Sequence, residues 1–104
     1  MTRQTLPGGA VVIRVEGELD LATSDTFEDA LGASHPGGQT VIDLTECTFI
    51  DSSAVRLFVE AARAAQETQG QVSLVTRDPG ISRVLEIAAV DTMLPVHDSV
   101  EAAI

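Results

Sequence analysis

The stretch TFIDSSAV, residues 48–55, places one carboxylate and two hydroxyls where an apolar run meets a helix-like run. Such a group could supply a serine nucleophile, a phosphorylation site or the cap of a helix. Local sequence favours the cap, with Ser52 or Ser53 binding the first free N–H groups and Asp51 complementing the helix dipole. A cap and a phosphorylation site are compatible, because the same N–H groups and dipole favour a phosphate. The motif therefore predicts a helix start that accepts a phosphate without unfolding.

A serine hydrolase would need a histidine within hydrogen-bond reach of Ser52. The chain has two histidines: we expect His35 in a Pro-Gly turn and His97 just past the last strand, both as solvated loop residues. Cys47 alone could supply a soft metal ligand, and its apolar surroundings favour a small core residue instead of a reactive thiolate. We therefore predict no catalytic residue, no metal and no cofactor.

Composition excludes several other classes of function. The chain has no lysine, which rules out a P-loop lysine or a Schiff base and argues against a phosphoacceptor receiver domain. Neither G-x-G-x-x-G nor G-x-S-x-G occurs. A formal charge of −10 argues against nucleic acid and anionic membranes as partners. A single cysteine and the lack of an apolar run of membrane-spanning length favour a cytoplasmic protein without direct membrane insertion.

The elements that position the motif alternate along the chain. Strands are expected over Met1–Leu6, Ala10–Val15 (closed by Gly17), Thr40–Leu44, Gln71–Thr76 and Met93–Val96. Helices are expected within Asp20–Ser34, over Ser53–Gln69, after Asp78-Pro79 and over Asp98–Ile104. The order β-β-α-β-α-β-α-β-α predicts one α/β domain over residues 1–104, with a mixed, mostly parallel sheet of four or five strands and about four helices. Partner sites in such sheets lie beyond the carboxyl ends of the strands, where the Asp-Ser-Ser motif falls.

Helical periodicity predicts which residues are buried. The first helix, with possible caps at Asp20, Thr23 and Ser24, would bury Phe27, Ala30 and Leu31. The second would bury Val55, Phe58, Ala62 and Ala65 and stop at Gly70 in a C′ position, and the third would bury Val84, Leu85 and Ala88. In the fourth strand, alternation indicates inward-facing Val72, Leu74 and Thr76.

FIDSSAV together with VEGELDLAT upstream resembles the STAS domain, and most of all the stand-alone bacterial anti-sigma-factor antagonists. The resemblance extends over nearly the whole chain and implies the STAS fold. It also implies that Ser52 is phosphorylated by the partner, an anti-sigma factor that is also an ATP-dependent serine kinase. Asp20, from GELD, would lie near this site with Asp51 and Ser53. The unphosphorylated protein would bind the anti-sigma factor and release sigma, phosphorylation would end that binding, and a serine phosphatase would restore it.

The family commonly continues the motif with Gly-Leu-Gly, whereas this chain continues it with Ala54-Val55-Arg56. Alanine and valine are tolerated in a helix. Arg56 could clasp a phosphate on Ser52, crowd the kinase or pair with Glu60 at i,i+4, and the ion pair is the favoured interpretation.

Two other functions are compatible with the same resemblance. One is a scaffold in a larger signalling assembly, which would self-associate stably. The other is an accessory subunit of a membrane transporter, which would copurify with membranes. The sequence leaves the oligomeric state open.

Overall fold

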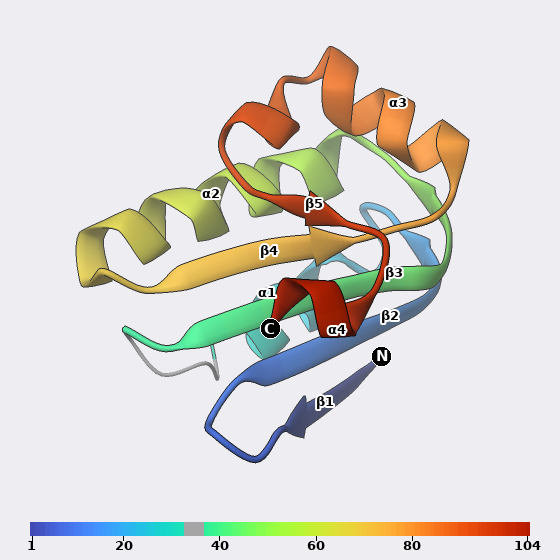
Figure 1. Ribbon diagram of the computed structural model, residues 1–104. Helices are drawn as coiled ribbons and strands as arrows, with labels where there is room; N and C mark the ends of the chain where they lie inside the picture. Colours follow the sequence, from blue (N-terminus) through green and yellow to red (C-terminus); the bar gives the residue numbers. More distant parts are fainter. Residues whose placement is uncertain (33–36) are drawn as a thin grey trace.

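The computed structural model describes residues 1–32 and 37–104. Its elements follow the predicted order, with one 3-10 turn added before the last strand (Figure 1). The strands are β1 (Thr2–Thr5), β2 (Val11–Leu19), β3 (Gln39–Ile50), β4 (Gln71–Val75) and β5 (Val96–His97). The helices are α1 (Ser24–Gly32), α2 (Ser52–Thr68), α3 (Pro79–Ile87), the 3-10 turn η1 (Val90–Thr92) and α4 (Val100–Ala103). The predicted mixed α/β fold is confirmed.

The five strands form one sheet in the order β1-β2-β3-β4-β5. β1 runs antiparallel to β2, and every other pair is parallel. The carboxyl ends of β2, β3 and β4 therefore lie at the same edge of the sheet. Because Leu19 is in register with Ile50, the residues that follow these two positions emerge side by side.

The strand predicted over Ala10–Val15 was expected to close at Gly17, and this was wrong. β2 continues to Leu19, and Gly17 sits inside it with φ +78°, next to a register shift against β3. Glycine is favoured at such an irregularity because it adopts positive φ without a Cβ clash. β2 continues through this irregularity to Leu19, so that the GELD motif reaches the same edge as the Asp-Ser-Ser motif.

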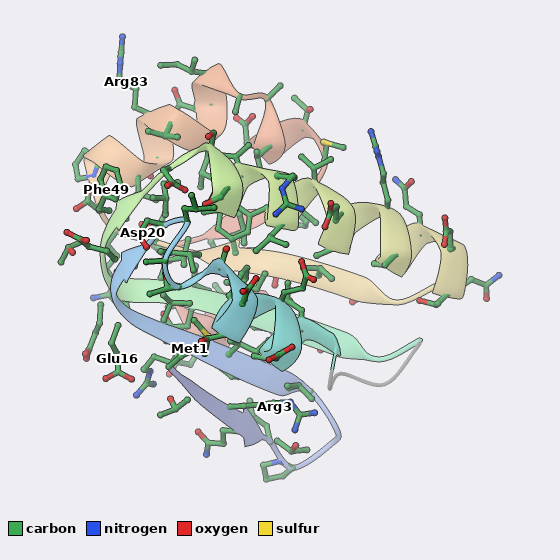
Figure 2. All side chains as sticks on the ribbon, turned by 180° about the vertical axis from the view of Figure 1, so that it is seen from behind. Met1, Arg3, Glu16, Asp20, Phe49 and Arg83 are labelled. Atoms are coloured by element: carbon green, nitrogen blue, oxygen red, sulfur yellow. The ribbon has the colours of Figure 1, made fainter. Side chains whose placement is uncertain are left out.

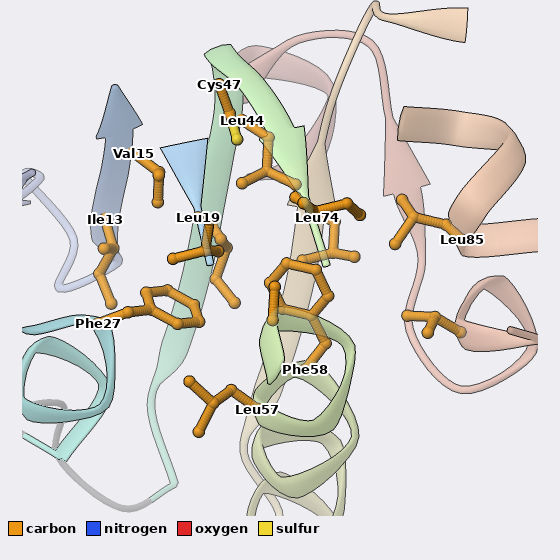
Figure 3. Packing of buried hydrophobic residues seen from close by; sticks show 14 of the residues in the cluster. Ile13, Val15, Leu19, Phe27, Leu44, Cys47, Leu57, Phe58, Leu74 and Leu85 are labelled. Atoms are coloured by element: carbon orange, nitrogen blue, oxygen red, sulfur yellow. The ribbon is translucent and has the colours of Figure 1, made fainter. Parts of the chain in front are cut away.

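The main core lies between the sheet and the helices α1, α2 and α3. Phe27 and Phe58 meet edge to face in it, with their ring centroids 5.9 Å apart (Figure 3). α1 and α2 bury the predicted Phe27, Phe58 and Ala62, whereas the expected Ala88 of α3 is exposed. Ile81 and Leu85 form the buried face of α3 instead.

A smaller cluster lies on the opposite face of the sheet, under α4. Val12, Val41 and Val75 are its buried residues, and Val100 and Ala103 cover them. β4 is therefore buried on both faces, so the simple alternation of Val72, Leu74 and Thr76 was an incomplete description. Figure 1 shows α4 on the face away from α2.

α2 stops before Gly70, which follows the C-cap residue Gln69 and so takes the predicted C′ position, but the left-handed conformation common at C′ is not found at Gly70. Gln69 adopts it instead, with φ +60° and ψ +26°, and its N–H donates to the Ala65 carbonyl. Gly70 is required for a different reason. A Cβ on Gly70 would lie 3.0 Å from the Gly38 carbonyl oxygen, which is an unusually tight contact, so a side chain there would require the backbone at Gly38 to shift.

The last strand was expected over Met93–Val96, but β5 starts three residues later and ends one residue later. Pro95 precedes β5 instead of belonging to it, and His97, expected past the strand, is its second residue and half-buried. Proline has no N–H to give to a ladder, so pairing with β4 starts only at Val96.

Candidate functional site

The candidate site forms where β2 and β3 end side by side. β3 runs to Ile50 without a break, and Asp51 is the first residue beyond it. The Asp51 N–H donates to the Leu19 carbonyl at 3.3 Å, which extends the pairing of the two strands by one residue. The GELD and Asp-Ser-Ser motifs, thirty residues apart in sequence, are thus adjacent.

Asp51 is the N-cap of α2, not Ser52 or Ser53. Its backbone is extended, and its Oδ1 accepts from the Ser53 N–H at 3.0 Å and the Ala54 N–H at 3.3 Å. The Ser53 hydroxyl donates to the same oxygen at 2.5 Å. The prediction that a serine caps the helix was wrong because β3 ends at Ile50, which leaves Asp51 in the flanking position that a cap requires.

The second carboxylate oxygen of Asp51 reaches the other motif. Oδ2 accepts from the Leu21 N–H at 3.2 Å. The Ser53 hydroxyl has the largest effect on the pKa of Asp51 and lowers it. Desolvation, the next largest effect, raises it, and hydrogen bonds from the backbone N–H groups of Ala54, Leu21 and Ser53 lower it again, so that the net shift is downward. The carboxylate is therefore held in its ionised form and ties α2 to the loop after β2.

Ser52 is the first residue of α2 and is exposed. Its hydroxyl has no hydrogen-bond partner among the residues that the structure describes, in contrast to the engaged hydroxyl of Ser53. Ser52 also sits at the positive end of a seventeen-residue helix. Of the two serines, Ser52 is therefore the one with a free, accessible hydroxyl.

Asp20 lies beside this point and shapes the loop. Its Oδ1 accepts from the Ala22 N–H at 3.0 Å and the Thr23 N–H at 3.2 Å, and the Thr23 hydroxyl donates to it as well. Figure 2 shows Asp20 and Phe49 at the same end of the molecule. Two carboxylates, Asp20 and Asp51, therefore come from neighbouring strand ends, and each orders backbone N–H groups of the loop.

Arg56 pairs with Glu60, as the favoured interpretation predicted. Its Nη1 lies 3.0 Å from Oε1, and both side chains are about half exposed, at 55% and 52%. No interaction between Arg56 and Ser52 is present in the described structure. The guanidinium is thus engaged one turn away from the free hydroxyl.

Sequence reasoning missed two exposed hydrophobic residues at this site. Leu21, directly after GELD, is 76% exposed, and Phe49, two residues before Asp51, is 49% exposed. Phe49 pairs in register with Glu18, on the opposite side of the strand from Ile50. The available signal was alternation: Ile50 faces the core, so Phe49 must face outward. An exposed Leu and Phe beside a free hydroxyl are typical of a protein contact surface.

The histidines make no catalytic arrangement in the part of the chain that is described. His35 lies outside the described residues. Asp51 and Ser52 form no hydrogen bond with His97, and Asp51 is already occupied by N–H donors and the Ser53 hydroxyl. Cys47 is buried, its Sγ donates to the Phe49 carbonyl, and burial raises the pKa of its thiol, as expected of a core residue.

Metal ligands and membrane spans are also addressed by the structure. Within residues 1–32 and 37–104, no three His, Cys, Asp or Glu side chains come together in a way that could hold a metal ion. In the same residues, no helix has the length and hydropathy needed to cross a membrane.

Comparison with known proteins gives consistent matches. The family model described as "Mlab, STAS domain" matches residues 2–95. The anti-sigma-F factor antagonist RsfA of Mycobacterium tuberculosis is 29% identical over 99 residues, which cover 91% of this chain and 77% of RsfA. The crystal structure of an anti-sigma factor antagonist from Mycobacterium paratuberculosis superposes with a TM-score of 0.84 at 25% identity, covering 98% of this chain and 89% of that one.

The fold also matches the antagonist SpoIIAA in two forms. The unphosphorylated form has a TM-score of 0.74 at 21% identity, over 97% of this chain and 90% of SpoIIAA. The phosphorylated form from Bacillus has a TM-score of 0.73 at 20% identity, over 97% and 94%. The fold of this chain is thus about equally similar to both forms.

Proposed function

This chain belongs to the STAS domain family, and from that membership we propose that it is an anti-sigma-factor antagonist that is switched off by phosphorylation of Ser52. Relatives that match it over most of their length include RsfA, named as an anti-sigma-F factor antagonist, and BtrV of Bordetella bronchiseptica, named as a putative anti-sigma factor antagonist. Unphosphorylated, it binds an anti-sigma factor and releases the sigma factor. Phosphorylated, it lets the anti-sigma factor go.

The free hydroxyl of Ser52 is the observation that carries the proposal. Ser53 donates its hydroxyl to the cap, so its phosphorylation would break a contact that starts α2. Ser52 is exposed and makes no such contact, so a phosphate would add charge without removing a bond. The positive end of the α2 dipole favours a phosphate there, although Asp51 already accepts the Ser53 and Ala54 N–H groups.

The effect of the phosphate is electrostatic. Phosphoserine adds about −1.5 to −2 charge at neutral pH. It would join Asp51 and Asp20, in a chain whose formal charge is already −10. Like charges brought together at an interface cost several kcal/mol, which is enough to dissociate a complex of ordinary affinity. No refolding is needed.

The partner surface consists of Ser52 with Asp20, Asp51 and Ser53 around it, and Arg56 at its margin. Leu21 and Phe49 supply the apolar contact that such interfaces bury. The partners are an anti-sigma factor that is also a serine kinase, and a serine phosphatase that restores the unphosphorylated state. The chain is a binding module and not an enzyme, consistent with relatives that are regulators.

A mass spectrum of the protein purified from its own host tests the phosphorylation itself. Ser52 and Ser53 lie on the same tryptic peptide, because the nearest arginines are Arg14 and Arg56, so fragment ions between the two serines must be resolved. We expect phosphate on Ser52, with an occupancy that differs between resting and stressed cells. A bare Ser52 in every condition, or phosphate confined to Ser53, would contradict the proposal and favour a scaffold or a transporter accessory subunit.

A further inference from the structure

The edge of the sheet at β4 is only partly covered. The Leu74 N–H donates to the Pro95 carbonyl and the Thr76 N–H donates to the His97 carbonyl, so even-numbered residues of this segment face β5. Val72 is the preceding even-numbered residue, and in a continued ladder its carbonyl would accept a hydrogen bond from the N–H of residue 95. Residue 95 is proline and has no N–H. Pairing therefore stops, and Figure 1 shows β5 beside only the carboxyl-terminal part of β4.

A cavity of about 450 Å³ opens at this uncovered edge. Its walls come from both faces of the sheet: Ala62 and Gln66 of α2 lie on one side, and Ala102 and Ala103 of α4 lie on the other. Among the described residues that line it, His97 is the only titratable one, and none is Asp, Glu or Arg. In a chain with a formal charge of −10, this is an uncharged surface.

Ser73 lines the same cavity, and its hydroxyl is a buried polar group that is not used. The residue is 6% exposed, and its hydroxyl has no hydrogen-bond partner within the described structure. The neighbouring polar side chain, Gln39, is satisfied, because its Nε2 donates to the Ala103 carbonyl at 2.8 Å. A buried hydroxyl without a partner costs free energy, so a group that enters the cavity and bonds to it gains that contact.

We propose that the β4 edge cavity binds an uncharged segment of a partner protein in extended conformation, added to the sheet as a short strand beside Gln71–Ser73. The Val72 N–H and carbonyl pair with its backbone, and the Ser73 hydroxyl provides a further polar contact. Alternate side chains of the segment then face the α2 wall and the α4 wall. The walls carry small residues and amides, so the segment needs no charge, and main-chain bonds supply most of the affinity. This surface is separate from the Ser52 site.

Amide spectra of the ¹⁵N-labelled full-length protein test this proposal, with the capped peptide acetyl-Val-Thr-Val-Thr-amide as the probe. We expect saturable shifts at Gln71, Val72 and Ser73. An analogue with N-methylated peptide bonds, which cannot complete the ladder, should produce none of them. Loss of the hydroxyl in Ser73→Ala should weaken the peptide about fivefold, as expected for one hydrogen bond, without lowering the melting temperature.

A matched pair of variants on α4 locates the effect. Ala102→Arg places a long side chain in the cavity mouth and should weaken binding by more than about fivefold. Glu101 is the adjacent residue and does not line the cavity, so Glu101→Arg should change the affinity for the peptide by less than about twofold. The proposal would be overturned if the peptide produced no shifts, or if the shifts appeared at other residues. It would also be overturned if neither Ser73→Ala nor Ala102→Arg weakened the binding. A dimer in sedimentation that Ala102→Arg dissociates would overturn it too, because a second copy would then occupy the edge.

Discussion

At the scale of the residue, Asp51 connects the parts of the candidate site. One oxygen caps α2 and accepts the Ser53 hydroxyl, and the other holds the Leu21 N–H of the loop after β2. A single carboxylate thereby leaves Ser52 as the free serine and sets the position of the loop beside it. Its negative charge also stands next to any phosphate that Ser52 receives.

The acid range tests the role of the Asp51 charge. A carboxyl group whose pKa is lowered on folding stabilises the folded state above its unfolded pKa of about 3.9, and that contribution is lost as the pH falls through the lower folded value. Asp51→Asn cannot titrate. We expect wild type to be more stable than the variant at pH 7 and the difference to shrink below about pH 4, measured by urea unfolding. A difference that stays constant down to pH 3 would contradict this assignment, and Asp91→Asn serves as the control.

Arg56 should matter little to folding. Its partner Glu60 is one turn away, and both side chains are about half in solvent. Such exposed pairs contribute between zero and about 1 kcal/mol, so we expect Arg56→Gln to change the free energy of unfolding by less than about 0.5 kcal/mol. Chemical denaturation measures it. A loss above about 1 kcal/mol would show that Arg56 has a structural contact beyond Glu60.

The sequence pointed to the polar residues of the candidate site, but it did not show which of them caps α2 and which keeps a free hydroxyl. Asp, Ser and Ser are almost equally good caps, so the motif alone does not decide which one takes the position. The decision comes from the length of β3, which continues to Ile50 because its pairing with β2 continues. Leu21 and Phe49 were missed for a related reason: whether a hydrophobic residue faces outward depends on the strand register around it.

At the scale of the element, the carboxyl ends of β2 and β3 position both motifs. β2 reaches its last residue only by passing through the irregularity at Gly17. Sequence patterns placed every helix and strand in the correct order, but they ended β2 too early, ended β3 at Leu44 instead of Ile50, and began β5 too soon. Glycine usually ends a strand, but Gly17 lies within β2. Pro95 directly precedes β5 and is not part of it. Both outcomes depend on tertiary pairing that no local window contains.

Two substitutions at the end of α2 are expected to change the stability of the protein in opposite directions. Gln69 adopts φ +60°, which costs a non-glycine residue about 1 kcal/mol, so Gln69→Gly should raise stability by up to that amount. Gly70→Ala should lower it by about 1–3 kcal/mol, because the new Cβ would meet the Gly38 carbonyl oxygen at 3.0 Å. Urea unfolding of both variants measures the two effects. The same sign for both would refute this description of the helix end.

At the scale of the whole molecule, the core and the proposed partner surface are separate. The three phenylalanines illustrate this: Phe27 and Phe58 meet in the main core, and Phe49 is half exposed beside Asp51. A phosphate on Ser52, as proposed, would therefore change the surface without reaching the core. The similar match to both forms of SpoIIAA agrees with a fold that persists through such a change.

Two alanine substitutions separate stability from recognition. Phe58→Ala should cost about 3–5 kcal/mol, a large share of the 5–15 kcal/mol expected for a domain of this size. Phe49→Ala should cost less than about 1 kcal/mol and should instead weaken binding of the anti-sigma factor. Unfolding curves and binding isotherms of the two variants provide the measurements. A Phe49→Ala protein that binds normally would remove Phe49 from the interface.

We propose that charge at Ser52 controls partner binding. The most direct test compares two affinities: that of the host's anti-sigma factor kinase for the wild type and that for Ser52→Asp. Ser52→Ala and Ser53→Ala are the matched controls, and a melting curve checks that Ser52→Asp remains folded. We expect Ser52→Asp to bind at least about tenfold more weakly at an unchanged melting temperature, with Ser52→Ala close to wild type. Equal affinity of wild type and a folded Ser52→Asp would contradict the account.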